Sequence, residues 1–188
     1  MGKKLLKIFI ILACIILVLY ILFGVFKIHN EIIKIIYPQK YSEYVEQVAM
    51  EYELDPLLLY AIIKAESNFD SEAVSRSNAV GLMQLMDSTA EETAGKLGIK
   101  YEKEMLKDPE MNIKLGSSYF NSLYDKYENI ALALTAYNAG SGNVDKWIEE
   151  ETISSDGSNI ENIPFRETNN YVRKILRDYE IYKKIYSD

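Results

Sequence analysis

Glu66 is the residue whose position in the sequence most strongly suggests chemistry. Asp55 followed by Pro56 gives an N-cap and a first helical residue, and this pair predicts the start of a helix. Glu66 comes four residues after Ile62 and three after Ile63, so it shares the apolar face of that helix. Burial there would raise the pKa of the carboxyl and let it act as a general acid near neutral pH. From the helix alone, the alternative is that Glu66 ends the apolar stripe and faces water.

The composition removes most other catalytic chemistries. The 188 residues include one cysteine, Cys14, and one histidine, His29. One chain therefore cannot build a disulfide, a Cys-based zinc site or a two-His metal site, and a catalytic triad would depend on His29 alone. We expect no metal and no cofactor, with the chemistry supplied by carboxylates, hydroxyls and amides. The formal net charge of −7 argues against binding nucleic acid.

The residues that must position Glu66 predict an all-α domain. Residues 41–188 show helical spacing of apolar side chains, and no segment has the sustained two-residue alternation that is typical of strands. Capping residues, prolines and glycines mark the expected helix ends, and the N-caps expected are Asp55, Ser88, Asp108, Asn129 and Asn143. The helices expected after Pro56 cover residues 56–67, 88–97, 109–127, 130–139, 143–150 and 168–185. We expect this domain to be monomeric.

An apolar run near the N-terminus predicts a membrane anchor. Residues 8–26 carry no charge, and as a helix they would be about 28 Å long, enough to cross the hydrocarbon core. Residues 1–7 include Lys3, Lys4 and Lys7, so the positive-inside rule predicts a cytoplasmic N-terminus. The expected protein is single-pass in the cell membrane, with a linker over residues 27–40 and an extracytoplasmic domain. A cleaved signal peptide is the alternative, but no A-x-A-like site follows the run.

Four short motifs follow one another from Glu66 towards the C-terminus. They are Glu66-Ser67-Asn68-Phe69-Asp70, then residues 75–90 with Gly81-Leu82-Met83-Gln84-Leu85-Met86, then Ala136-Tyr137-Asn138-Ala139-Gly140, and finally Ile163-Pro164-Phe165 with Glu167-Thr168 and Tyr171-Val172. In this order and spacing they resemble the soluble lytic transglycosylase family, the goose-type-lysozyme-like branch of the lysozyme superfamily. The resemblance covers about residues 42–180. Each motif is weak alone, but four in order are specific.

The resemblance implies a lysozyme-like domain with a groove for the glycan strands of peptidoglycan. It implies that Glu66 is the catalytic acid and base. The residues implied to contact the substrate are Ser75, Met83, Gln84, Tyr137, Asn138 and Glu167. Ser75 would lie near the acetamido group of muramic acid, Met83 and Gln84 would line the groove, and Glu167 would lie on its floor. Without the resemblance, turn and packing roles would be the preferred interpretation of Ser75 and Met83, Tyr137 and Asn138 would belong to an ordinary helix end, and Glu167 to the first turn of a helix.

The implied reaction uses one carboxyl group twice. Protonated Glu66 gives its proton to the oxygen of the β-1,4 bond between N-acetylmuramic acid and N-acetylglucosamine, through an oxocarbenium-like transition state. The resulting carboxylate takes the proton of the C6 hydroxyl, whose oxygen closes a 1,6-anhydro ring. No water is consumed, so no second carboxylate is needed to activate one.

Two residues depart from the family pattern, and two rival functions stay open. Asn78 stands where the family often has Gly, and Asn tolerates positive φ better than other non-glycine residues. Asp87 stands where the family usually has Pro, and it adds a carboxylate near the expected groove. A hydrolytic muramidase could use Glu66 with Asp87 or Asp70 as the second carboxylate. A rival from another class is a non-catalytic glycan-binding or scaffold protein of an envelope machine.

Overall fold

The chain divides into two compact units, Met1–Pro38 and Gln39–Asp188, in a computed structural model that describes residues 2, 17, 18, 20, 24 and 31–187. Most of the predicted membrane segment, residues 8–26, lies outside the described residues, as do Cys14 and His29. Among the residues that are described, no helix is both long and apolar enough to cross a membrane.

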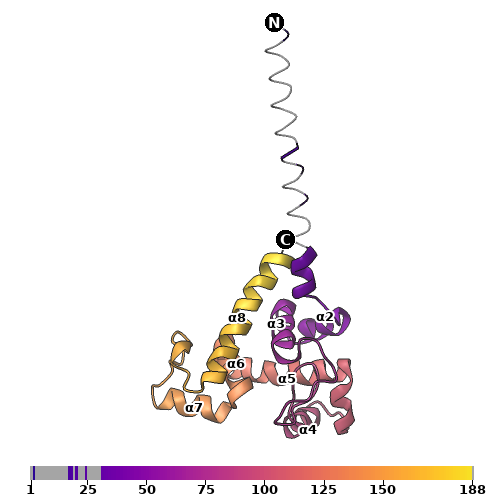
Figure 1. Cartoon of the computed structure of the whole chain (residues 1–188). Helices are drawn as coiled ribbons and strands as arrows, with labels where there is room; N and C mark the ends of the chain where they lie inside the picture. Colours follow the sequence, from indigo (N-terminus) through magenta and orange to yellow (C-terminus); the bar gives the residue numbers. More distant parts are fainter. Residues whose placement is uncertain (1, 3–16, 19, 21–23, 25–30, 188) are drawn as a thin grey trace. The chain divides into compact units, whose positions relative to one another are not determined.

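The second unit is built from helices, as the sequence predicts (Figure 1). The α-helices are α2 (Ser42–Glu51), α3 (Pro56–Ser67), α4 (Asp87–Lys96), α5 (Pro109–Tyr127), α6 (Ile130–Ala139), α7 (Ser141–Glu149) and α8 (Arg166–Tyr186), and the short 3-10 helices are η1 (Lys103–Lys107) and η2 (Ile160–Asn162). Extended pairing within residues 39–187 is limited to isolated bridges that join Val80 to Val74 and to Leu85. The all-α prediction is confirmed.

Side-chain caps fix the start of three helices where the sequence predicts them. Asp55, Asp108 and Asn129 each accept a hydrogen bond of 2.8–3.1 Å from a backbone N–H in the first turn of α3, α5 and α6. Such a cap contributes about 1 kcal/mol to stability. The caps expected at Ser88 and Asn143 are wrong, because both residues lie inside their helices.

Helix α3 lies at the centre of the second unit, where it packs against α8 and α2 (Figure 1). Its middle turns are almost fully buried, with six consecutive core residues: Leu58, Leu59, Tyr60, Ala61, Ile62 and Ile63. Burial of each large apolar side chain contributes roughly 1.5–3 kcal/mol. This anchorage fixes the direction of α3 and therefore the place where its last turn presents Glu66.

The loop between α3 and α4 is held on α5 by one buried amide. Asn112 accepts a 2.7 Å hydrogen bond from the backbone N–H of Met83 and donates to the carbonyls of Val80 and Leu106 at 3.0 and 2.8 Å. A Cβ at Gly81, where φ is +81°, would lie 2.2 Å from the Leu106 carbonyl oxygen, so only glycine fits there. The loop is thus a fixed wall beside Glu66.

Asn78 allows this loop to turn without the glycine of the family pattern. Its φ is 64°, in the left-handed region that Asn tolerates, so the expected positive φ is confirmed. The backbone N–H of Asn78 donates to the Ser75 carbonyl, and the Ser75 hydroxyl accepts from the N–H of Ala79 at 3.0 Å. The loop that carries Ser75 therefore closes on itself through local hydrogen bonds.

Candidate active site

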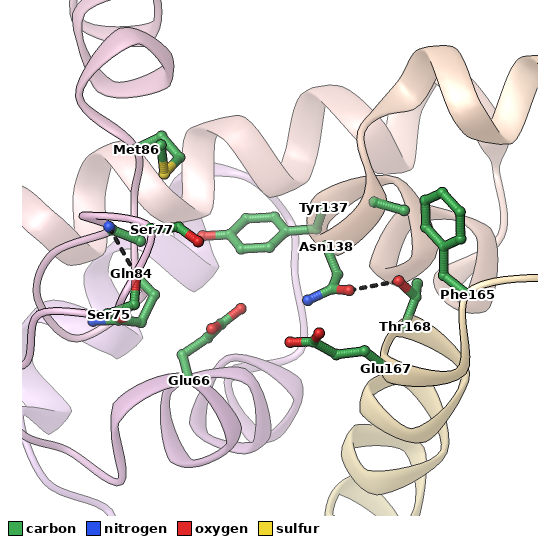
Figure 2. Close-up of a pocket in the computed structure, with 12 residues that line it drawn as sticks. Glu66, Ser75, Ser77, Gln84, Met86, Tyr137, Asn138, Phe165, Glu167 and Thr168 are labelled. Carbon is green, nitrogen blue, oxygen red and sulfur yellow. Dashed lines mark hydrogen bonds between the residues drawn. The ribbon is translucent and has the colours of Figure 1, made fainter.

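A pocket of about 480 Å³ opens where the end of α3, the loop before α4, the end of α6 and the start of α8 meet (Figure 2). Glu66 lies on one side of it, and Tyr137 and Asn138 face it from α6. The lining residues are Glu66, Ser75, Ser77, Ala79, Gln84, Met86, Tyr137, Asn138, Ala139, Phe165, Glu167 and Thr168. Residues more than 100 positions apart in the sequence thus share one site.

Five of the six residues expected to contact substrate line this pocket with Glu66, namely Ser75, Gln84, Tyr137, Asn138 and Glu167. Met83 does not, so the expectation that its side chain lines the groove is wrong. That side chain is fully buried against Gly116 and Ser117 of α5, because the polypeptide turns inward at this point to meet Asn112. Its carbonyl oxygen instead accepts a 2.8 Å hydrogen bond from the Tyr137 hydroxyl.

The Glu66 carboxyl is partly buried and has one short hydrogen bond. The Tyr171 hydroxyl of α8 donates to Glu66 Oε1 at 2.6 Å. Burial raises the pKa of Glu66 to about 7, and it outweighs the opposing effects of the Tyr171 hydrogen bond and the Lys174 charge. At neutral pH, both the acid and its conjugate base are therefore present in quantity.

The acids named as possible second carboxylates do not line the pocket. Asp87 accepts a 2.7 Å hydrogen bond from the Tyr101 hydroxyl and lies 3.4 Å from Lys103 Nζ, and these partners lower its pKa. Asp70 is exposed and accepts from the backbone N–H of Glu72. The second carboxylate of the pocket is Glu167. The described part of the chain holds no group of three or more acidic, His or Cys side chains that could bind a metal ion.

Comparison with known proteins shows the family to which the chain belongs. The family profile described as "Transglycosylase SLT domain" matches residues 43–159. The chain belongs to this family. Its SLT domain is similar to the soluble lytic murein transglycosylase of Escherichia coli strain K12, with 32% identity over 154 residues that cover 80% of this chain and 24% of the relative. It is also 36% identical over 116 residues to the membrane-bound lytic murein transglycosylase C of Photorhabdus laumondii, covering 56% of this chain and 32% of the relative.

Solved structures show the same fold as this SLT domain. The 70-kDa soluble lytic transglycosylase of Escherichia coli superposes with a TM-score of 0.75 at 30% identity, over 83% of this chain and 26% of that one. The lytic transglycosylase Slt of Pseudomonas aeruginosa, solved as an inactive Glu-to-Gln mutant, gives 0.72 at 36% identity, over 79% of this chain and 24% of that one. The expected lysozyme-like helical fold is confirmed. The chain spans about a quarter to a third of the length of these relatives.

Three residues on the first turns of α8 were not assigned a role from the sequence. Tyr171 bonds to Glu66, Lys174 Nζ donates to the Ala65 carbonyl at 3.1 Å, and the Thr168 hydroxyl donates to Asn138 Oδ1 at 2.7 Å. Tyr171 and Lys174 follow Glu167 by four and seven residues, which places Glu167, Tyr171 and Lys174 on one face of a helix. This spacing could have indicated from the sequence that Tyr171 and Lys174 lie near the site.

The SLT domain pocket combines polar groups with two large apolar side chains, Phe165 and Met86. Phe165 is about half exposed and packs edge-on against Trp147, with 4.9 Å between ring centroids. Met86, at 43% exposed, lines the pocket from the loop before α4. Apolar surface beside a few fixed donors and acceptors suits the apolar faces and the hydroxyl groups of a sugar ring.

Proposed function

We propose that the protein is a membrane-anchored lytic transglycosylase of peptidoglycan. It cleaves the β-1,4 bond between N-acetylmuramic acid and N-acetylglucosamine and leaves a 1,6-anhydromuramic acid end, with Glu66 as general acid and then base. The observation that carries the proposal is the partly buried Glu66 carboxyl in the pocket, with a pKa of about 7. The substrate is supported by the SLT family, whose relatives are named lytic murein transglycosylases.

In the first step, Glu66 protonates the glycosidic oxygen as its bond to the anomeric carbon breaks. The Tyr171 hydroxyl holds Oε1, so the other carboxyl oxygen is the one that carries the transferred proton. The same hydrogen bond stabilises the carboxylate that remains after transfer. A pKa near the working pH favours both donation and later recovery of the proton.

In the second step, the C6 hydroxyl of the same muramic acid attacks the anomeric carbon. A bond forms between O6 and C1, and the hydroxyl proton passes to the Glu66 carboxylate, which restores the starting enzyme. The pocket offers fixed groups to hold the sugar during this closure. Asn138 Oδ1 already accepts from Thr168, which leaves its Nδ2 to donate to a sugar oxygen. Gln84 Nε2 donates to the Ala73 and Gly81 carbonyls, which leaves Gln84 Oε1 as an acceptor.

Hydrolysis by a muramidase is the alternative within the same site. An inverting hydrolase needs a second carboxylate roughly 6.5–9.5 Å from the acid to activate water. Glu167 is the acid that lines the pocket with Glu66, whereas Asp87 is bonded to Tyr101 outside it. We therefore expect Asp87→Asn to change neither the rate, beyond about twofold, nor the product. A rate that falls tenfold or more in Asp87→Asn would show that Asp87 takes part in the reaction.

Anchoring in the membrane is supported by the sequence of residues 8–26 and by the membrane-bound relative. Alkaline carbonate extraction of membranes that contain the full chain tests it. An anchored chain stays with the lipid, and a variant that lacks residues 1–30 is released. Release of the full chain would contradict the anchor.

The catalytic proposal is tested with Glu66→Gln, which keeps the size of the side chain and removes the transferable proton. We expect the rate of peptidoglycan clearing to fall by about a thousandfold or more, while the helical circular dichroism and the binding of isolated glycan strands stay unchanged. Glu180→Gln on exposed α8 surface is the matched control and keeps full activity.

Mass spectrometry of the wild-type digest then separates the two reactions. Anhydromuramic ends, lighter by one water than reducing ends, are expected. Reducing ends would replace the proposal by the hydrolase, and clearing by Glu66→Gln would remove Glu66 as the acid. If the wild-type protein binds glycan strands but does not clear peptidoglycan, the result would favour a non-catalytic glycan-binding protein.

A further inference from the structure

Two lysines join α3 to α8, and they differ in their partners. Lys64 Nζ lies 3.1 Å from Asp178 Oδ2, and the Asp178 side chain is fully buried. Lys174 Nζ donates to the Ala65 carbonyl oxygen at 3.1 Å. Within residues 31–187, no carboxylate lies within 4 Å of Lys174 in an ion pair. Lys64 is thus neutralised by its partner, and Lys174 is not.

Lys174 donates its hydrogen bond to the backbone of Ala65, the residue just before Glu66. Ala65 precedes Glu66 in the last turn of α3, where the helix leaves carbonyl groups without intrahelical partners. A cation at a helix C-terminus is favoured by the helix dipole as well as by the hydrogen bond. Tyr171, three residues before Lys174 on the same face of α8, holds the Glu66 carboxyl itself. One face of α8 therefore fixes both the backbone and the side chain of this turn.

The groups that face Glu66 come from three sides. Helix α8 contributes Tyr171, Lys174 and the pocket-lining Glu167, and α6 contributes Tyr137, whose pKa is raised by burial and by the Glu66 charge. The loop before α4 contributes neutral side chains to the pocket, including Ser75, Ser77 and Gln84. Among the described residues, Lys174 is the cation whose charge acts on Glu66.

We infer that Lys174 is a positioning residue for Glu66, fixing the last turn of α3 through the Ala65 carbonyl and stabilising the Glu66 carboxylate between the two proton transfers. The inference rests on the proposed role of Glu66. Loss of the cation leaves the carboxylate less stable, which raises the pKa of Glu66 and makes it a weaker acid. The protonated form then persists to higher pH, so the falling limb of the pH–rate profile moves upward.

Lysine variants separate charge from anchoring. Lys174→Gln keeps a donor for the Ala65 carbonyl and removes the charge, Lys174→Met removes both, and Lys174→Arg keeps both. Muropeptide release by the full chain in detergent micelles is measured from pH 5 to pH 9. For Lys174→Gln and Lys174→Met, we expect the ratio of the rate at pH 8 to that at pH 6 to rise about threefold, with Lys174→Arg at the wild-type ratio.

Lys64→Met is the matched control, since it breaks the other lysine bridge between the same helices. It is expected to lower the melting temperature and to leave the shape of the pH–rate profile unchanged. An unmoved limb in Lys174→Gln, or an equal shift in Lys64→Met, would overturn the inference. Glu66→Gln in the same assay keeps the two proposals distinguishable. If that variant is inactive, an unmoved limb removes the role of Lys174 alone, and if it is active, the role of Glu66 fails as well.

Discussion

Glu66 and Asp178 are two acids at the interface of α3 and α8 whose pKa values move in opposite directions. For both, burial raises the pKa and is the largest single cause. At Asp178, hydrogen bonds from Arg177 and Lys64 outweigh burial, so its pKa falls below the ordinary value. Glu66 has a neutral hydrogen-bond donor, Tyr171, and one cation acting on it, so burial prevails.

The difference between the two pKa values shows that one helix interface can hold both an ionised acid and an acid that keeps its proton near neutral pH. A fully paired carboxylate is ionised and joins two helices, but it has no proton to give at neutral pH. A buried carboxyl without enough compensating partners keeps its proton, and its ionisation lowers the free energy of unfolding. The pKa of Glu66 is above its ordinary value of 4.5, so this loss of stability is absent below pH 4.5 and complete above pH 7.

Removing the paired acid should have the largest effect on stability. Asp178→Asn leaves the Lys64 ammonium, whose side chain is 13% exposed, without its buried carboxylate. We expect the free energy of unfolding at pH 7 to fall by about 3–5 kcal/mol, measured by urea denaturation. The exposed change Asp125→Asn is the control and should stay within about 0.5 kcal/mol. A loss below about 1 kcal/mol at Asp178 would show that the pair does not hold the helices together.

Removing the Glu66 carboxyl should raise the free energy of unfolding, the opposite of the effect expected at Asp178. Glu66→Gln is expected to raise the free energy of unfolding at pH 8 by about 1–3 kcal/mol, because the folded state no longer contains a poorly compensated carboxylate. At pH 4, where Glu66 is protonated in both states, the two proteins should melt at nearly the same temperature. Thermal unfolding at the two pH values measures this, and equal stability at pH 8 would contradict the pKa of about 7.

Removing the hydroxyl that bonds to Glu66 should have a smaller effect, on the pH dependence of activity. Tyr171→Phe removes a hydrogen bond that lowers the pKa of Glu66, so the falling limb of the pH–rate profile should move to higher pH. We expect the ratio of the rate at pH 8 to that at pH 6 to rise about fourfold, more than in the Lys174 variants, because the Tyr171 hydrogen bond lowers the pKa of Glu66 more than the Lys174 charge does. Tyr101→Phe removes the hydroxyl that bonds to Asp87 outside the pocket, and it should leave the profile unchanged. A limb that moves to lower pH in Tyr171→Phe would reverse the assigned direction.

The sequence is sufficient for the features that depend on local spacing. Helical periodicity places Glu66 on the apolar face of α3, and the N-caps at Asp55, Asp108 and Asn129 follow from residue type and position. The expected positive φ at Asn78 is also local. The four ordered motifs place five of the substrate-contact candidates in one pocket, because their family spacing carries information about the tertiary fold.

The sequence is insufficient to predict contacts that a side chain makes with residues distant in the chain. Tyr171 meets Glu66 across 105 positions, and only the packing of α8 on α3 decides that contact. Met83 turns into the core because Asn112 of α5 captures its backbone N–H. Asp87 follows the pocket residue Met86 directly, yet its carboxylate bonds to Tyr101.

Titration of the Glu66 carboxyl by carbon-13 NMR tests the account most directly. The protein is labelled at the side-chain carboxyl carbons of its glutamates, and the Glu66 signal is assigned as the one that Glu66→Gln removes. The expected midpoint is near pH 7, because burial raises the pKa of Glu66 more than the Tyr171 hydrogen bond and the Lys174 charge lower it. A midpoint near the ordinary value of 4.5 would mean that Glu66 is fully ionised at neutral pH and would contradict its proposed role as the general acid.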